Sequence, residues 1–131
     1  MLLSEIALYL ENNGLGVRAT NLFAGEIPLD APGDLAIGLY ETGGGPPQFV
    51  FEQNDRLVET PGLQVIVRAA DYEVGRERIE LIVKKLTFRN RVLSGVRYLS
   101  MVPVQSPIDI GRDGNERHQL SVNFDVMKEP S

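Results

Sequence analysis

The sequence predicts an α+β fold in which a mixed, mainly antiparallel sheet has helices packed on one face. Two segments have the 3.6-residue periodicity of amphipathic helices, and several short segments alternate apolar and polar side chains as half-buried strands do. The chain has 131 residues, 43% of them hydrophobic, which is the size of one compact domain. We therefore predict a single domain over residues 1–131, with its α+β core over about residues 20–128.

The first predicted element is a helix over residues 2–13. Its apolar side chains fall on one stripe, and they are Leu2, Leu3, Ile6 and Leu10. Asn13 and Gly14 predict the end of this helix, because both residues tolerate the left-handed conformation that closes helices. A strand is predicted next over residues 35–41, where Leu35, Ile37 and Leu39 alternate with smaller or polar neighbours.

The middle of the chain is divided by glycine and proline. Residues 42–47 (TGGGPP) predict a break that no helix or central strand accommodates, followed by a short strand over residues 48–52. Pro61-Gly62 predicts a turn, and residues 63–70 form the next predicted strand. Because Ile66 is apolar on the face opposite Val65 and Val67, this strand is predicted to be central and covered on both faces.

The second predicted helix follows Asp71, whose side chain can cap its amino end. The residues expected on its buried stripe are Tyr72, Gly75, Ile79, Ile82 and Leu86. Residues 95–105 then form an extended run, and a polar connection from Pro107 has its tightest bend at Asp113-Gly114-Asn115. A last strand over about residues 117–127 is predicted to pair antiparallel with the extended run, since apolar residues alternate from Leu120.

The charge of the chain is unevenly distributed. The net charge is −5 and the pI is about 4.9, which argues against a protein whose main work is to hold nucleic acid. Residues 1–66 carry nine acidic groups against Arg18 and Arg56 alone, whereas residues 67–131 carry nine acidic and eleven basic groups. Two interpretations stay open: solvated surface charge that keeps the protein soluble, or copies that meet acidic surface against basic surface in a ring.

Little in the sequence points to catalysis, a cofactor or a metal. The chain has no cysteine, and its one histidine, His118, has no nucleophile in a recognisable motif beside it. Residues 43–45 (GGG) lead into two prolines rather than into the helix that a phosphate-binding loop requires. Residues 109–115 offer oxygen ligands without the spacing of a calcium loop. We therefore expect no enzyme activity, no cofactor and no metal.

Neither a signal peptide nor a membrane span is expected. Residues 1–14 lack a basic amino-terminal region and a long apolar run, and Glu5 interrupts the apolar stretch. No segment approaches the roughly 20 apolar residues of a transmembrane helix. We expect synthesis and folding in the cytoplasm, with no membrane partner.

Three segments together carry a resemblance to a known family. They are residues 37–44 (IGLYETGG), residues 61–72 (PGLQVIVRAADY) and residues 105–124, which run from Gln105-Ser106-Pro107 to Val122-Asn123-Phe124. In their order and spacing they resemble the minor capsid or tail-terminator proteins of long-tailed bacteriophages. The likeness covers roughly residues 20–128 and includes no catalytic signature.

This resemblance implies a structural virion protein with a tail-terminator-like fold, made in the bacterial host and located at the head–tail junction. It implies a ring, usually a hexamer, that caps the tail tube and gives the surface on which the head attaches. The implied partners are other copies of the chain, the tail tube protein and the head-completion or connector protein, while DNA passes through the ring without specific binding. An acidic lumen would let the DNA slide through without adhering.

Two loops are the candidates for assembly contacts, because they are polar and connect strands. They span residues 42–48 and 109–117, and the residues singled out in them are Thr42, Gln48, Asp109, Arg112, Asp113, Asn115 and Arg117. Two alternatives stay open at this point. One is a head-completion or stopper protein of the same neck, and the other is a small-ligand or nucleotide-binding module that uses the glycine loop around Gly44.

Overall fold

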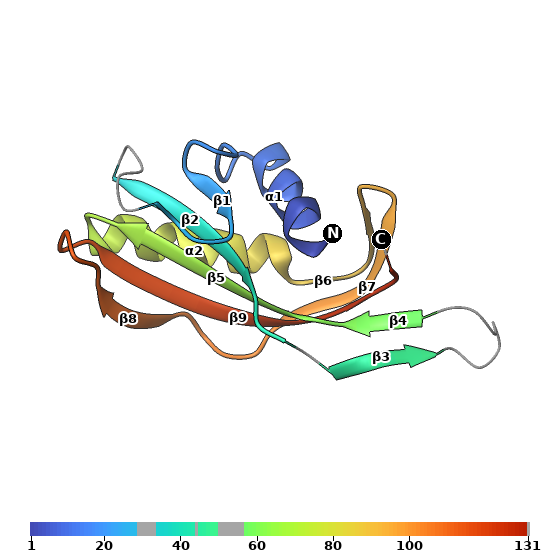
Figure 1. Cartoon of the computed structure of the whole chain (residues 1–131). Helices are drawn as coiled ribbons and strands as arrows, with labels where there is room; N and C mark the ends of the chain where they lie inside the picture. The colour runs from blue at the N-terminus through green and yellow to red at the C-terminus, as the bar shows by residue number, and fades with distance from the viewer. Residues whose placement is uncertain (29–33, 44, 50–56, 131) are drawn as a thin grey trace.

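The computed structural model describes residues 1–28, 34–43, 45–49 and 57–130 (Figure 1). Two helices and nine strands lie in this part of the chain. In chain order they are α1 (Leu2–Asn12), β1 (Leu22–Ala24), β2 (Leu35–Glu41), β3 (Gly45–Phe49), β4 (Leu57–Thr60), β5 (Gly62–Ala69), α2 (Tyr72–Leu86), β6 (Phe88–Leu93), β7 (Val96–Pro103), β8 (Ile108–Arg112) and β9 (His118–Lys128). The α+β class predicted from the sequence is confirmed.

Strand β9 organises the sheet. One of its edges pairs antiparallel with β5 over most of its length, from Gly62 opposite Asp125 to Ala69 opposite His118. The other edge pairs with β8 near the start of β9 and with β7 near its end. Strand β2 pairs antiparallel with β5, and β1 adds to β2 in the one parallel ladder between described strands. The sheet is therefore mixed and mainly antiparallel, as predicted.

The main core is formed by side chains of the sheet and of both helices. Alternate residues of β5 and β9, such as Val65 and Val122, are fully buried in one cluster. Buried side chains of both helices belong to the same cluster, including Ile6 and Leu10 of α1 and Ile79 of α2. On the opposite face of β5, Ile66 packs against a smaller cluster that contains Ile27 and Ala36. The prediction that apolar contacts cover both faces of this strand is thus confirmed.

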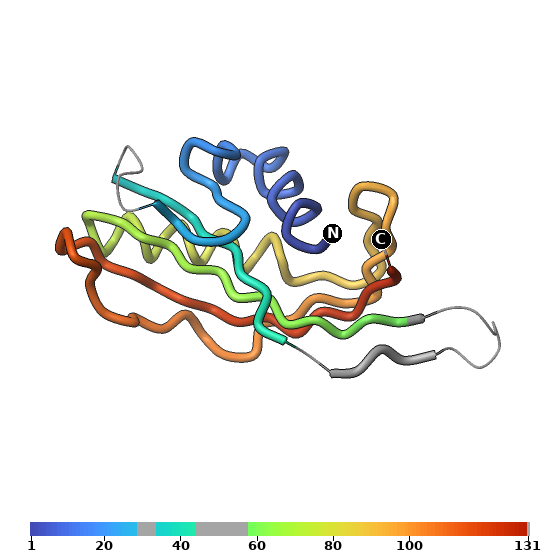
Figure 2. Tube along the Cα trace, in the orientation of Figure 1, coloured from blue at the N-terminus to red at the C-terminus, as the bar shows by residue number. Residues whose placement is uncertain are grey.

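A projecting arm extends the central hairpin of the sheet. Strands β3 and β4 pair with each other and continue the antiparallel pair β2 and β5 beyond the body of the molecule (Figure 1). The trace of β9 runs alongside that of β5 through this body (Figure 2). The arm touches the rest of the sheet through the pairing of Glu59 with Lys128. Pro46 and Pro47 fall within β3, which pairs only with β4 among the described strands, so these prolines occupy an edge.

The Pro61-Gly62 turn predicted from the sequence is wrong. Gly62 is the first residue of β5 and follows β4 after one residue, so the chain passes through this point extended. Its carbonyl accepts a hydrogen bond of 3.1 Å from the Thr42 amide. A Cβ at Gly62 would lie 2.4 Å from the Gly43 carbonyl oxygen, which is too close for any other residue without a backbone shift. The glycine is therefore needed for close approach of two strands and not for a reversal of the chain.

Other boundaries follow the sequence closely. The first helix ends one residue earlier than predicted, with Asn13 as its C-cap and Gly14 at φ +75°. Asp71 caps α2 as predicted, its side chain accepting a 2.9 Å hydrogen bond from the Glu73 amide. Tyr72 was predicted on the buried stripe of α2 but is 39% exposed; it is the first residue of the helix, and the buried residues begin at Gly75. Of the predicted strand over residues 48–52, residues 50–52 lie outside the described part.

Candidate functional site

The turn between β8 and β9 is held by the carboxylate of Asp113. Its Oδ1 accepts hydrogen bonds from the backbone amides of Asn115 (3.0 Å) and Arg117 (2.9 Å). Its Oδ2 accepts a third bond from Nε of Arg117, also at 2.9 Å. Burial raises the pKa of Asp113, but the hydrogen bonds from the Arg117 and Asn115 amides and the Arg117 side chain outweigh it, so the pKa is lowered. The ionised carboxylate of Asp113 therefore stabilises the turn through hydrogen bonds within it.

Arg68 connects this turn to the sheet. It lies on β5, is 3% exposed, and its Nε lies 3.8 Å from Oδ2 of Asp113. Its Nη1 donates a 2.9 Å hydrogen bond to the carbonyl of Pro28. A buried arginine therefore joins the end of the segment after β1 to the β8–β9 turn, on the face of β5 opposite the main core.

The seven predicted contact residues lie in two separate places. Asp109, Arg112 and Asn115 are exposed on β8 and the turn, and Arg112 pairs with Glu116 at 3.2 Å. Asp113 and Arg117 are in the same turn, but their side chains are largely used within the molecule. Thr42 is exposed beyond the end of β2, and Gln48 lies in β3. Figure 1 shows the two places at opposite ends of the sheet.

A buried polar cluster that was not predicted from the sequence joins α1 to the sheet. The Tyr98 hydroxyl donates a 2.6 Å hydrogen bond to Oε1 of Glu5, and Nζ of Lys128 donates to the same oxygen at 3.1 Å. Nζ of Lys128 also lies 5.3 Å from the centroid of the Tyr98 ring. Glu5 is 5%, Tyr98 0% and Lys128 1% exposed. The signal was available, since Lys128 continues the buried phase of β9 that runs through Phe124 and Val126.

Hydrogen bonds keep the Glu5 carboxylate of this cluster ionised. Burial raises the pKa of Glu5, but hydrogen bonds from Tyr98, the amino terminus and Lys128 exceed that effect, so the pKa lies below its ordinary value of 4.5. Burial, with the neighbouring Glu5 carboxylate, raises the pKa of Tyr98, which therefore stays a hydrogen-bond donor. The cluster is a structural tie and holds no evident nucleophile.

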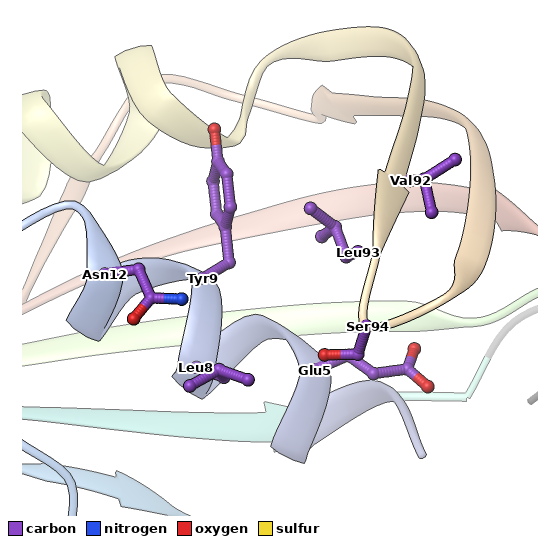
Figure 3. Close-up of a pocket in the computed structure, with 7 residues that line it drawn as sticks. All are labelled: Glu5, Leu8, Tyr9, Asn12, Val92, Leu93 and Ser94. Carbon is purple, nitrogen blue, oxygen red and sulfur yellow. The ribbon is translucent and has the colours of Figure 1, made fainter.

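A hollow of about 250 Å³ lies beside this cluster, between α1 and the β6–β7 hairpin (Figure 3). The helix lines it with four side chains and the hairpin with three. The lining residues are Glu5, Leu8, Tyr9, Asn12, Val92, Leu93 and Ser94. Next to it, the guanidinium of Arg91 lies over the rings of Tyr9 and Phe88 and donates to the Tyr9 hydroxyl. The volume of the hollow is below the range typical of small-molecule sites, about 300–1,000 Å³.

No arrangement typical of catalysis or metal binding emerges in the described residues. His118 is half-buried, and its ring meets Tyr72 edge-on with centroids 5.7 Å apart. No group of three or more His, Cys, Asp or Glu within the described ranges is placed to hold a metal ion. Residues 42–47 were predicted as a break, but Gly45 already begins strand β3, which contains both prolines, so the predicted break is wrong over residues 45–47. None of the described helices is long and apolar enough to cross a membrane.

The fold and these surfaces define an α+β protein that offers edge strands, a tied turn and a projecting arm to its surroundings. The family described as "Bacteriophage tail terminator protein" matches residues 9–129, so the chain belongs to this family of structural phage tail proteins. The resemblance seen in the sequence is thereby confirmed. No curated protein matches the sequence.

A solved structure shares the fold. A chain of the "Virion of native gene transfer agent (GTA) particle" superposes with a TM-score of 0.53 at 14% sequence identity. The match covers 95% of this chain and 86% of that chain. At this identity the likeness is one of fold alone.

Proposed function

We propose that the protein is a single-domain tail terminator whose copies form a ring on the last ring of the tail tube, with six members as the family resemblance implies. The ring stops tube polymerisation and presents the surface on which the filled head, through its connector, is joined. The observation that carries this proposal is the family match, which spans residues 9–129 rather than one motif. The protein acts by assembly and not by catalysis.

The architecture supports a ring-forming subunit. Buried side chains from both helices enter one core cluster, so we infer that α1 and α2 cover the same face of the sheet. The strands β3 and β8 are each paired along one edge only, among described strands. Free strand edges and a projecting arm are features by which copies of a chain join.

The charge distribution supports heterologous contacts in that ring. The first 66 residues carry a clear excess of acidic groups, and the rest of the chain carries a small excess of basic groups. In a head-to-tail ring, each interface brings two different surfaces of the subunit together, so opposite charge at the two surfaces stabilises the contact. DNA then passes through the ring without specific binding, as expected of an acidic protein.

Incubation of the purified protein with separated phage components tests this function. A terminator binds tails that lack it and stops further tube growth, whereas a head-completion or stopper protein binds filled heads first. Electron microscopy of both mixtures, with the subunit labelled, identifies which component is occupied. Binding to heads and not to tails would replace the terminator by the stopper, one layer higher in the same neck.

A further inference from the structure

Five exposed cations lie together where α2 ends and the β6–β7 hairpin begins. They are Lys84 and Lys85 in the last turn of α2 and Arg89, Arg91 and Arg97 on the hairpin. The two elements are adjacent, since the Tyr9 hydroxyl donates to the Lys85 carbonyl and accepts from Arg91. Within the described residues, none of these five side chains forms an ion pair with a carboxylate. This surface, the cationic end of the molecule, therefore suits an acidic partner.

The hollow between α1 and the hairpin opens beside the cationic end. Val92 of β6 is 63% exposed, and it lines the hollow together with Leu8 and Leu93 (Figure 3). The Glu5 carboxylate already accepts three hydrogen bonds within the buried cluster, so it offers no free charge at the hollow. A volume of about 250 Å³ fits one protein side chain better than a small-molecule ligand.

The start of α2 presents the complementary arrangement. Glu73 and Glu77 are exposed there, and Val74 beside them is 46% exposed. Residues three or four positions apart are neighbours on a helix, so Glu77 lies next to both Glu73 and Val74. Neither carboxylate forms an ion pair in the part of the chain that the structure describes. These three residues form the acidic surface of α2.

The two surfaces lie at opposite ends of one helix. Figure 1 shows α2 running along the sheet, with the β6–β7 hairpin beyond its last turn. The helix dipole favours a carboxylate in the first turn and cations in the last turn. It does not explain Glu77, which lies in the second turn, or the arginines of the hairpin, which lie outside the helix. Nor does it stabilise the exposed side chains of Val74 and Val92, which a partner would cover.

The hollow and the cations together favour a protein partner over a nucleic acid. Phosphates would pair with the cations but would leave Val92 and the hollow uncovered, and stacked bases need exposed aromatic faces. The rings nearest the hairpin, Tyr9 and Phe88, are already covered by Arg91. A suitable partner carries an apolar side chain next to carboxylates, as in the centre and rim of a protein interface. The acidic surface of α2 has this composition.

We propose that the cationic end of one copy of this chain binds the acidic surface of α2 of a second copy. Val74 of the second copy occupies the hollow, and Glu73 and Glu77 face Arg89 and Arg97. Each copy gives one surface and receives the other, which is the heterologous contact that a ring repeats. The proposal rests on the proposed ring and names the contact between its neighbouring subunits.

Cysteine pairing tests this contact directly, because the chain has no cysteine of its own. The single variants Val74→Cys and Val92→Cys, mixed in equal amounts and oxidised in assembled tails, should give a covalent dimer on non-reducing gels. Either variant alone should give none, because a heterologous contact does not bring two copies of the same position together. A dimer from one variant alone, or no dimer from the mixture in tails, would overturn the proposal.

Val104→Cys is the matched control for Val92→Cys. It makes the same chemical change at a valine that is 58% exposed, but Val104 follows the other end of β7. Mixed with Val74→Cys, it should give no dimer. A dimer yield equal to that of Val92→Cys would show that the cross-link reports random collision and not the proposed contact.

Charge reversal gives a second and independent test. Arg89→Glu/Arg97→Glu in the Val92→Cys chain should remove most of the dimer, and so should Glu73→Lys/Glu77→Lys in the Val74→Cys chain. Mixing the two reversed chains should restore it, because each reversed hairpin then meets a reversed helix. This rescue also shows that both reversed chains fold. Reversals without effect, or without mutual rescue, contradict the contact.

Three further outcomes separate this contact from the function. Ordinary tail capping without any dimer would overturn the contact and leave the terminator function standing. A dimer from proteins that do not bind tails would do the reverse. Salt-sensitive binding of duplex DNA that is lost in Arg89→Glu/Arg97→Glu, without any dimer in tails, would assign the cationic end to nucleic acid instead.

Discussion

Tyr98 on β7 donates a buried hydrogen bond of 2.6 Å to Glu5 on α1, across 93 positions of the sequence. Lys128 at the end of β9 donates to the same carboxylate oxygen. One carboxylate therefore fixes the first helix to two strands that lie late in the chain. Removing one partner of such a buried pair is costly, because the remaining charge stays desolvated.

We expect Glu5→Gln to lower the free energy of unfolding by about 3–5 kcal/mol near neutral pH, because Lys128 then lacks its buried counter-ion. Urea unfolding of both proteins measures the difference. Glu11→Gln makes the same chemical change on the same helix at a more exposed site and should have a much smaller effect. Equal losses in the two variants would show that the buried cluster is not a stabilising tie.

The same pair predicts a dependence of stability on pH. The folded pKa of Glu5 is depressed below 4.5, so its contribution is fully present above the unfolded value and is lost as the pH falls through the folded pKa. The gap between wild type and Glu5→Gln should therefore close on acidification below about pH 4.5. A gap that stays constant from neutral to acid pH would contradict the depressed pKa.

Gly62→Ala should destabilise the protein by about 1–3 kcal/mol, because the added methyl would meet the Gly43 carbonyl and the Thr42 hydroxyl. Thermal unfolding compares it with Gly114→Ala, where open space and an ordinary backbone predict little change. The close approach at Gly62 is refuted if both substitutions are equally tolerated. In assembled tails, Gly62→Ala should also alter the arm, since residue 62 joins it to the central strand.

Reversal of charge at Arg112 distinguishes an effect on assembly from an effect on the stability of the fold. Arg112→Glu should leave thermal stability nearly unchanged, because Arg112 is exposed and pairs only with exposed Glu116 in the described part of the chain. If this turn contacts a neighbouring ring or subunit, the yield of infectious particles should fall, and Arg112→Lys should restore it. Normal yield from Arg112→Glu would remove Arg112 from the contact.

Arg117→Glu should behave differently from Arg112→Glu. It places a second carboxylate beside Asp113, whose Oδ2 now accepts from Arg117, and it should therefore loosen the turn. Hydrogen exchange at the Asn115 and Arg117 amides, both bonded to Asp113, should speed up. A loss of particles with Arg117→Glu alone, without faster exchange, would indicate a direct contact rather than a structural role.

The sequence predicted the long periodic elements well, because their patterns reflect burial alone. Helix α2 and the strands β2, β5 and β9 lie within one or two residues of their predicted bounds. Strands β1, β4, β6 and β8 were missed, since their side chains are mostly polar or too few to show alternation. Each is specified by its neighbour in the sheet, as β8 is by its pairing with β9.

The candidate surfaces were harder to predict, because they too depend on contacts that the local sequence pattern does not show. Asp113 and Arg112 are neighbours with similar polarity, yet one is tied into the turn and the other is exposed. The hollow beside Val92 combines α1 with a hairpin more than 80 residues later in the chain, so no local spacing reveals it. Lys128 was also missed, because the last strand was predicted to end at about residue 127, although the alternation of β9 continues to a buried position at Lys128.

The central position of β9 has a consequence for synthesis. The helices and strands up to β8 leave the ribosome before it, and β2, β5, β6 and β7 can form pairs among themselves. Strand β8, however, has β9 as its one partner among the described strands, and β7 joins the rest of the sheet only through β9. Translation must therefore reach Lys128 before the sheet can close, so until then the nascent chain exposes apolar strand edges that a chaperone would recognise.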